Sequence, residues 1–294
     1  MLAATKNAKS FHMPDLIHLT PHIGGRVKDL DVAAGLTTAQ RAWLLRALLD
    51  RKVLVLPSQT LSAESFHAFA GGFGSLQHHV LRKYRHADYP GLSWLTNVAT
   101  DGSVDSFGVT RATNWHSDGS YSVDPPALGM LYALEIPSRG GGTIFADMAN
   151  AYDALPDATR QRLAGFNGLH RHGGGPGGGM YDGTLGDDQK EGHEDVMHPA
   201  VTRHPQTERQ VLYVNTTHTR KFAELAAARS VELINSLVEG ATTPDNLYTH
   251  NWQVGDVLMW DQRSTMHRGA GDYPPTDRRV KLRAIVQSLH DELS

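Results

Sequence analysis

The sequence predicts an α+β domain with a mainly β core, built as a β-sandwich or jelly roll. Short apolar runs of strand length recur at irregular spacing, and amphipathic segments of helical period lie near the start and in long insertions. Strands and helices do not alternate regularly, as a doubly wound parallel fold would need. With 294 residues, 40% of them hydrophobic, and no convincing linker, we expect a single domain over residues 1–294.

Apolar residues at helical spacing predict four helical segments. Thr37 or Thr38 caps the first, Ser62 caps the second, and Pro156 breaks the third. The segments are residues 38–51, 62–74, 151–166 and 223–241.

Short apolar runs bounded by turn residues predict the strands of the core. They are residues 53–56, 92–98, 127–136, 142–148, 210–215, 246–252, 255–261 and 278–287. Residues 171–193 interrupt this pattern with glycine runs and almost no apolar periodicity. This segment is either a tolerated surface insertion or a flexible lid over a functional site.

The composition excludes several classes of function. A net charge of −3 gives no basic excess, so we expect neither a nucleic-acid partner nor a membrane partner. The chain has no cysteine, which excludes disulfides, thiolate metal sites and cysteine nucleophiles. No apolar run has the length of a signal peptide or a membrane span, so we expect a cytoplasmic protein.

The segment TNWHSDGSY, residues 113–121, contains a candidate pair of metal ligands, His116 and Asp118. A third ligand, His267, follows the apolar run GDVLMWD. Two imidazoles and one carboxylate can occupy one face of an octahedral Fe(II) and leave positions open for substrate and oxygen. Each histidine taken singly is more often a surface or hydrogen-bonded core residue. Asn114 and Asp261 are candidates to orient the two imidazoles.

The segment RRVKLRAIV, residues 278–286, suggests a site for carboxylates. On a strand, Arg279, Lys281 and Arg283 point to one side, and Arg278, Val280 and Leu282 to the other. Two arginines on one face can bind carboxylates through paired hydrogen bonds, although such a row can also be a solvated strand face. Thr143 supplies a hydroxyl directly after a triple glycine.

These motifs, in their order and spacing from about residue 20 to 288, resemble the taurine / 2,4-dichlorophenoxyacetate (TauD/TfdA) family of Fe(II)- and 2-oxoglutarate-dependent dioxygenases. The resemblance implies a double-stranded β-helix, or jelly roll, with flanking helices. It implies Fe(II) held by His116, Asp118 and His267, with 2-oxoglutarate and O2 as cosubstrates. It also implies that Thr143 and Arg279 bind 2-oxoglutarate, and that Arg283 binds the substrate or assists the cosubstrate.

The resemblance places His79, Arg82 and Arg283 at the substrate site, which favours a small organic anion. Trp94, Tyr121 and Met180 are candidate apolar walls, although tryptophan and methionine are more often core residues. We expect hydroxylation of a carbon next to a heteroatom, with succinate and CO2 as coproducts, and an aryloxyalkanoate-like substrate. An alkyl sulfonate or a sulfate ester is the alternative substrate. A zinc-dependent hydrolase or an inactive jelly-roll binding protein is the alternative class. Family members are often dimers or tetramers, so we expect a homo-oligomer.

Overall fold

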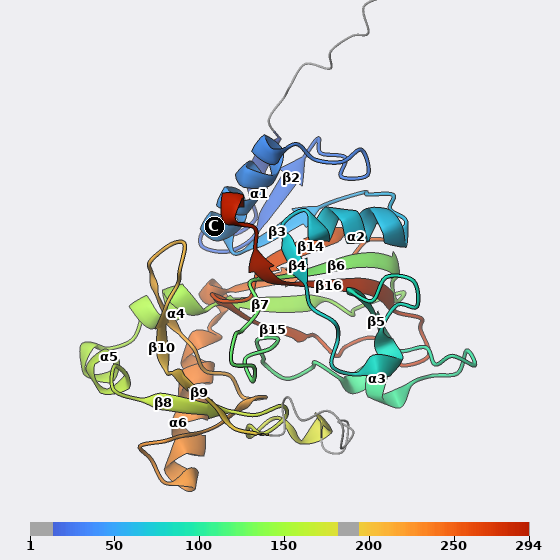
Figure 1. Cartoon of the computed structure of the whole chain (residues 1–294). Coiled ribbons are helices and arrows are strands. Elements are labelled where there is room, and N and C mark those ends of the chain that lie inside the picture. The colour runs from blue at the N-terminus through green and yellow to red at the C-terminus, as the bar shows by residue number, and fades with distance from the viewer. Residues whose placement is uncertain (1–13, 182–193, 294) are drawn as a thin grey trace, which may run out of the picture.

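The computed structural model describes residues 14–181 and 194–293 and is built around an eight-stranded sheet (Figure 1). Seven strands lie in the order β1–β2–β3–β14–β6–β16–β4, and β5 also pairs with β16. The pairing is antiparallel except between β2 and β3. The strands are β1 (Asp15–His18), β2 (Gly25–Lys28), β3 (Val53–Leu56), β4 (Gly74–Leu76), β5 (Leu92–Thr96), β6 (Leu128–Glu135), β14 (Val257–Asp261) and β16 (Val280–Leu289).

A smaller sheet packs on the inner face of the large one and completes the jelly roll. It contains β13 (Leu247–His250), β7 (Thr143–Asp147) and β15 (Thr265–Gly269), in that order and antiparallel. Figure 1 shows β7 and β15 beside β6 and β16. Phe145 on β7 meets Trp260 on β14, with ring centroids 5.7 Å apart. The space between the sheets is therefore filled by aromatic side chains at this point.

The side-chain alternation of the strands sorts residues between two cores. On β14, Leu258 and Trp260 face the small sheet, whereas Val257 and Met259 face outward. The outward residues are covered by helices α1 (Thr38–Arg51) and α2 (Ala63–Gly71), which contribute residues such as Leu48 to the same cluster. Both faces of the central strands are buried, which explains their continuous apolar sequence.

The remaining elements form a layer beside the small sheet. Its core includes Leu163, Phe222 and Ile234, all buried. Its elements are α4 (Met148–Asp153), α5 (Asp157–Leu163), β8 (Asn167–His170), β9 (Val196–Pro199), β10 (Val201–Arg203), β11 (Gln210–Leu212), β12 (Thr219–Phe222) and α6 (Ala227–Ala241). A short helix, α3 (Ser106–Thr110), and four 3-10 turns complete the described chain: η1 (Arg82–Tyr84), η2 (Gly179–Tyr181), η3 (Pro244–Asn246) and η4 (Asp291–Leu293).

Most of the predicted elements are confirmed. Thr37 and Ser62 cap α1 and α2 through their side chains, and the helix break falls at Pro156, between α4 and α5. The structure adds strands that were not predicted, among them β8, β9 and β12, each of four residues. None of the helices in the described ranges is long and apolar enough to cross a membrane.

The glycine-rich segment is only partly covered by the structure. Its first part lies against residues 216–218: Gly175 N–H donates to the Thr217 carbonyl at 2.9 Å, and Gly177 N–H to the Thr216 carbonyl at 2.7 Å. Residues 182–193 lie outside the described residues, as does the side chain of Met180. A lid over residues 171–193 therefore stays a prediction.

Candidate metal centre and active site

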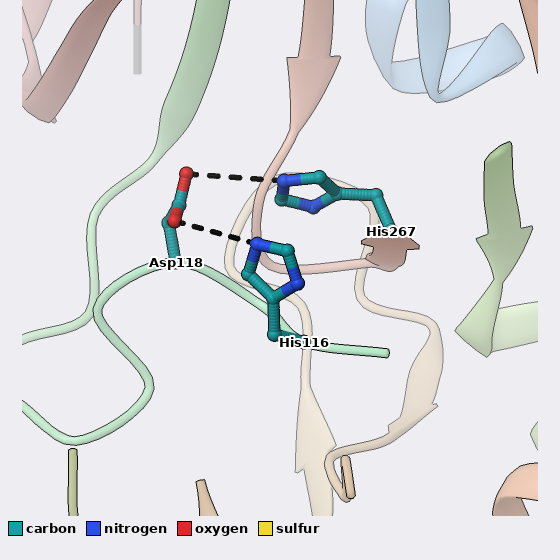
Figure 2. Close-up of side chains that lie close together, drawn as sticks. All are labelled: His116, Asp118 and His267. Carbon is teal, nitrogen blue, oxygen red and sulfur yellow. Dashed lines mark ion pairs between the residues drawn. The ribbon is translucent and has the colours of Figure 1, made fainter. Parts of the chain in front are cut away.

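His116 and His267 are brought together by a backbone bridge between a loop and β15. The two residues exchange backbone hydrogen bonds of 3.0 and 2.8 Å, and their ring centroids are 4.2 Å apart. Asp118 lies in the following turn, with one carboxylate oxygen 3.8 Å from His116 Nε2 and the other 3.9 Å from His267 Nε2. The three side chains point to one centre (Figure 2), and their ligand atoms all lie within 4.8 Å of one another.

The surroundings fix both imidazole rings. His116 Nδ1 donates to the Asn114 carbonyl at 2.8 Å, which leaves the lone pair of Nε2 free to bind a metal ion at the centre that it shares with Asp118 and His267. The His267 ring stacks on Phe145, with centroids 5.6 Å apart. The prediction for Asn114 is thus confirmed, through its backbone. The prediction for Asp261 is wrong, because its carboxylate accepts a hydrogen bond from Ser264 and lies 3.0 Å from His204 Nε2, so it contacts neither ligand imidazole.

The electrostatics give the centre two neutral nitrogen donors and one anionic oxygen donor. Burial lowers the pKa of both imidazoles, that of His267 to about 3. Burial alone would raise the pKa of the Asp118 carboxyl, but Arg283 and the two imidazoles outweigh it and hold the pKa below its usual range. Two neutral imidazoles and one carboxylate, without thiolates, form a ligand set that fits a divalent ion such as Fe(II). Gln262, which the sequence analysis missed, donates to Asp118 at 3.2 Å.

The inner face of β16 carries the predicted basic row. Leu282 belongs to the outer core and Arg278 pairs with Glu135 at the surface, whereas Arg279 and Lys281 are buried. Arg283 Nη1 lies 3.4 Å from both oxygens of Asp118, so it borders the metal centre. The alternation read from the sequence is therefore confirmed.

Arg279 and Thr143 lie in a different part of the interior from Arg283. Arg279 Nη2 donates to the Gly108 carbonyl at 3.3 Å, its guanidinium stacks on Tyr273 at 4.9 Å, and its buried Nε has no partner. Thr143 Oγ1 accepts a hydrogen bond from the Trp252 indole at 3.0 Å. A buried guanidinium with an unused donor fits an incoming carboxylate.

Two adjoining cavities lead to the metal ligands. The outer one, of about 410 Å³, is lined by His79, Arg82, Asp118, Tyr121 and Arg283 among others. The inner one, of about 60 Å³, shares His79, Asp118, Tyr121 and Arg283 with it and also reaches His116. The predicted substrate residues therefore line one continuous space, with Arg82 exposed at its rim. Tyr121 is confirmed as a wall, but Trp94 lines a separate cavity of about 630 Å³ beside Lys83 and Val104.

A group of aromatic side chains beside the metal centre was also missed. His218 lies next to His116, with ring centroids 6.2 Å apart, and stacks on His172 at 5.7 Å. Tyr181 completes the wall of the inner cavity. His172 and Tyr181 belong to the glycine-rich segment, so the unusual composition of that segment was the available signal.

Comparison with known proteins decides the family. The family model described as "Taurine catabolism dioxygenase TauD, TfdA family" matches residues 15–285. The chain belongs to this family. The TauD/TfdA assignment makes it a 2-oxoglutarate-dependent dioxygenase on a jelly-roll core, which requires a metal ion and 2-oxoglutarate, as the resemblance implied. Iron is the metal that the family implies.

Several TauD/TfdA relatives match most of the chain. Pentalenolactone F synthase of Streptomyces arenae is 33% identical over 81% of this chain and 83% of its own. The 2,4-dichlorophenoxyacetate dioxygenase of Burkholderia sp. (strain RASC) is 30% identical over 94% of this chain and 95% of its own. An alkylsulfatase of Acinetobacter baylyi is 30% identical over 90% of this chain and 82% of its own. The crystal structure of AAD-2 with Mn(II) and N-oxalylglycine superimposes with a TM-score of 0.82 at 30% identity, covering 96% of this chain and 100% of that one.

Proposed function

We propose that this dioxygenase hydroxylates a carbon next to a heteroatom in a small organic anion, with an aryloxyalkanoate-like compound favoured. The charge of the two cavities carries this proposal. Among the described residues that line them, Asp118 is the one acidic residue, whereas four are basic: Arg82, Arg85, Arg111 and Arg283. A buried excess of positive charge favours an anionic ligand.

We assign the cofactor roles as follows. His116, Asp118 and His267 hold Fe(II), and Arg279 with Thr143 holds the distal carboxylate of 2-oxoglutarate. When bound, iron and 2-oxoglutarate would supply the activation of O2 for the hydroxylation, and 2-oxoglutarate would be converted to succinate and CO2. The support for these roles is the shared centre of the three ligands and the unpartnered Nε of Arg279. The protein positions both small molecules and keeps water away from the carbon that reacts.

His79 and Arg283 bind the substrate anion at the metal end of the cavity in this proposal. His79 Nδ1 lies 2.9 Å from the Leu81 N–H and 3.2 Å from the Leu81 carbonyl, and the shorter contact favours the tautomer in which Nδ1 accepts and Nε2 carries the proton that can be donated to an anion. Burial, reinforced by Arg283 and Arg111, holds the pKa of His79 well below its usual range. His79 therefore acts as a neutral hydrogen-bond donor, and Arg283 supplies the charge. Arg82 stays a candidate at the rim of the cavity.

An alkyl sulfonate or sulfate ester is the second candidate substrate. The alkylsulfatase and the 2,4-dichlorophenoxyacetate dioxygenase are equally similar to this chain, at 30% identity each, so identity does not choose between them. Tyr121, Tyr181 and Phe107 line the cavities and favour an aromatic body, because such walls stack on flat rings. If hydroxylation occurs beside an ether or ester oxygen, the product collapses to a carbonyl compound in either case.

An anaerobic spectrum tests the proposed centre, and a substrate screen tests the substrate. Protein, Fe(II) and 2-oxoglutarate mixed without oxygen should give a visible charge-transfer band, and His116→Ala should abolish it. A zinc hydrolase or a binding protein would give no band in the parent chain. Succinate release would then be compared for 2,4-dichlorophenoxyacetate, hexyl sulfate and taurine. Release with none of the three, while the band is present, would contradict the substrate class alone.

We further propose that residues 1–294 form one domain, that residues 171–193 cover the site, and that the protein is a cytoplasmic homo-oligomer. The position of His172 and Tyr181 at the inner cavity supports the covering role. The absence of cysteine is compatible with a reducing compartment. Light scattering of the purified chain measures the oligomeric state.

A further inference from the structure

Arg111 is a buried arginine that adds positive charge to the inner cavity but has no assigned ligand. It follows α3, is 6% exposed, and lines the inner cavity together with His116, Asp118 and Arg283. The cavity thus contains a second guanidinium close to the metal ligands. The position escaped the sequence analysis because a single arginine in a loop has no periodic or motif signal.

The guanidinium of Arg111 is held firmly but is not fully used. It stacks on the Tyr84 ring at 4.1 Å, and Nη2 donates to the Trp94 carbonyl at 2.7 Å. The Tyr84 hydroxyl donates to Asp105 at 2.7 Å, which fixes the ring under the guanidinium. Arg111 Nε is buried without a hydrogen-bond partner, and Arg111 forms no ion pair with a carboxylate in the described part of the chain. A preorganised cation with an unused donor is suited to binding an anion.

The backbone connects Arg111 to the metal centre. The next residue, Ala112, has a φ of +63°, which is uncommon for a residue with a Cβ and costs on the order of 1–3 kcal/mol. Its carbonyl accepts a hydrogen bond from Gly269 N at 2.7 Å, two residues after His267 on β15. The strained turn therefore fixes the position of Arg111 relative to the metal ligand His267.

The charge of Arg111 has no counterpart in the cavity. Burial lowers its pKa to about 10, so the guanidinium still carries its charge near neutral pH. Asp118 is already shared between Arg283 and the metal centre. A buried charge without a partner is costly, and a bound anion would remove that cost.

We propose that Arg111 and Arg283 together clamp the anionic group of the substrate, an oxyanion with at least two free oxygens, while its apolar part lies against Phe107 and Tyr181. This inference rests on the proposed function and adds a specificity-determining residue to it. The two rings meet edge to face, with centroids 6.1 Å apart, and form one wall of the inner cavity. Carboxylates and sulfate esters both satisfy this requirement, because both offer paired oxygens to a guanidinium fork.

Calorimetric titration of the inert complex tests the clamp without turnover. The full chain is loaded with Mn(II) and N-oxalylglycine and titrated with 2,4-dichlorophenoxyacetate, with hexyl sulfate, and with 2,4-dichloroanisole, which lacks the carboxylate. Arg111→Gln should weaken both anions about 10- to 100-fold and leave the neutral ether unchanged. Arg111→Lys keeps the positive charge but loses the bidentate geometry of the guanidinium, so the loss of anion affinity should be smaller than in Arg111→Gln. If the glutamine variant does not fold, the lysine variant carries the test.

The controls separate the possible results. Arg278→Gln removes an arginine that precedes β16 and pairs with Glu135 at the surface, so it should leave all three affinities unchanged. N-oxalylglycine should bind Arg111→Gln as it binds the parent chain. Anion affinities that stay at the parent value in both Arg111 variants, but fall in Arg283→Gln, would overturn the clamp and leave the proposed function standing. If the parent binds neither anion, the clamp and the substrate class both fail.

Discussion

Replacing Arg279 by alanine gives a direct measure of how the chain binds 2-oxoglutarate. Arg279 is 5% exposed, its buried Nε has no partner, and the hydrogen bond from its Nη2 to the Gly108 carbonyl is 3.3 Å long. The side chain therefore gives up little on binding a carboxylate. We expect Arg279→Ala to weaken 2-oxoglutarate strongly and to change the fold little, because the Arg279 backbone N–H keeps its 2.8 Å bond to the Asn97 side chain.

The expected loss can be worked out from this geometry. A hydrogen bond to a charged group contributes about 1.5–3 kcal/mol, and a bidentate pair contains two such bonds. Since Arg279 must release its weak bond to Gly108 and Thr143 still holds the carboxylate, we expect a net loss of about 2–4 kcal/mol. That range corresponds to a rise of roughly 30- to 900-fold in Kd at 25 °C.

Anaerobic titration of the Fe(II)-loaded protein with 2-oxoglutarate, followed by the charge-transfer band, measures this Kd. The matched control is Arg278→Ala, which removes the neighbouring arginine from the surface pair with Glu135 and should leave Kd unchanged. An unaltered Kd in Arg279→Ala would refute the assignment of the distal carboxylate to this residue. A large loss in Arg278→Ala would show that strand distortion, and not a missing ligand, causes the effect.

Two further predictions concern stability, measured by urea unfolding. Gly129→Ala should lower the free energy of unfolding by about 1–3 kcal/mol or more, because the added Cβ would lie 2.2 Å from the buried Trp260 ring. The matched control, Gly240→Ala on α6, adds its Cβ in open space and should leave the free energy of unfolding unchanged or raise it. Lys281→Met should raise stability at pH 7, because Lys281 is 1% exposed, stacks on Trp252, and has a pKa that burial holds well below 10.5. Between the lowered pKa of Lys281 in the folded chain and 10.5 in the unfolded chain, only the unfolded chain binds the lysine proton. The stability of the parent therefore rises with pH in this range. The stability advantage of Lys281→Met should shrink as the pH approaches 10.5. A gain that does not depend on pH would mean that packing, not charge, limits stability at this position.

Local chemistry explains why some of the fold could be predicted. The capping box of Thr37 and Gln40 and the apolar spacing behind it define α1 within one stretch of chain. The two-residue alternation through residues 278–286 placed Arg279 and Arg283 on one side of the chain before any partner strand was known, and only the structure showed that this side is buried. Strands β8 and β12 were missed because their four-residue sequences, NGLH and TRKF, lack the continuous apolar run that revealed β3, which is equally short.

The sequence by itself determined the ligand types and a β-sandwich or jelly-roll class, because these depend on residue identities and on periods that repeat along the chain; its resemblance to the TauD/TfdA family then indicated the jelly roll. Only the tertiary structure decided that a loop bridge joins His116 to His267, that Arg283 borders Asp118 while Arg279 contacts Gly108, and that Arg111 enters the cavity. Each of these depends on contacts between segments far apart in sequence. The strand pairing that creates such contacts joins residues far apart along the chain, so the local sequence around each residue does not identify its partner.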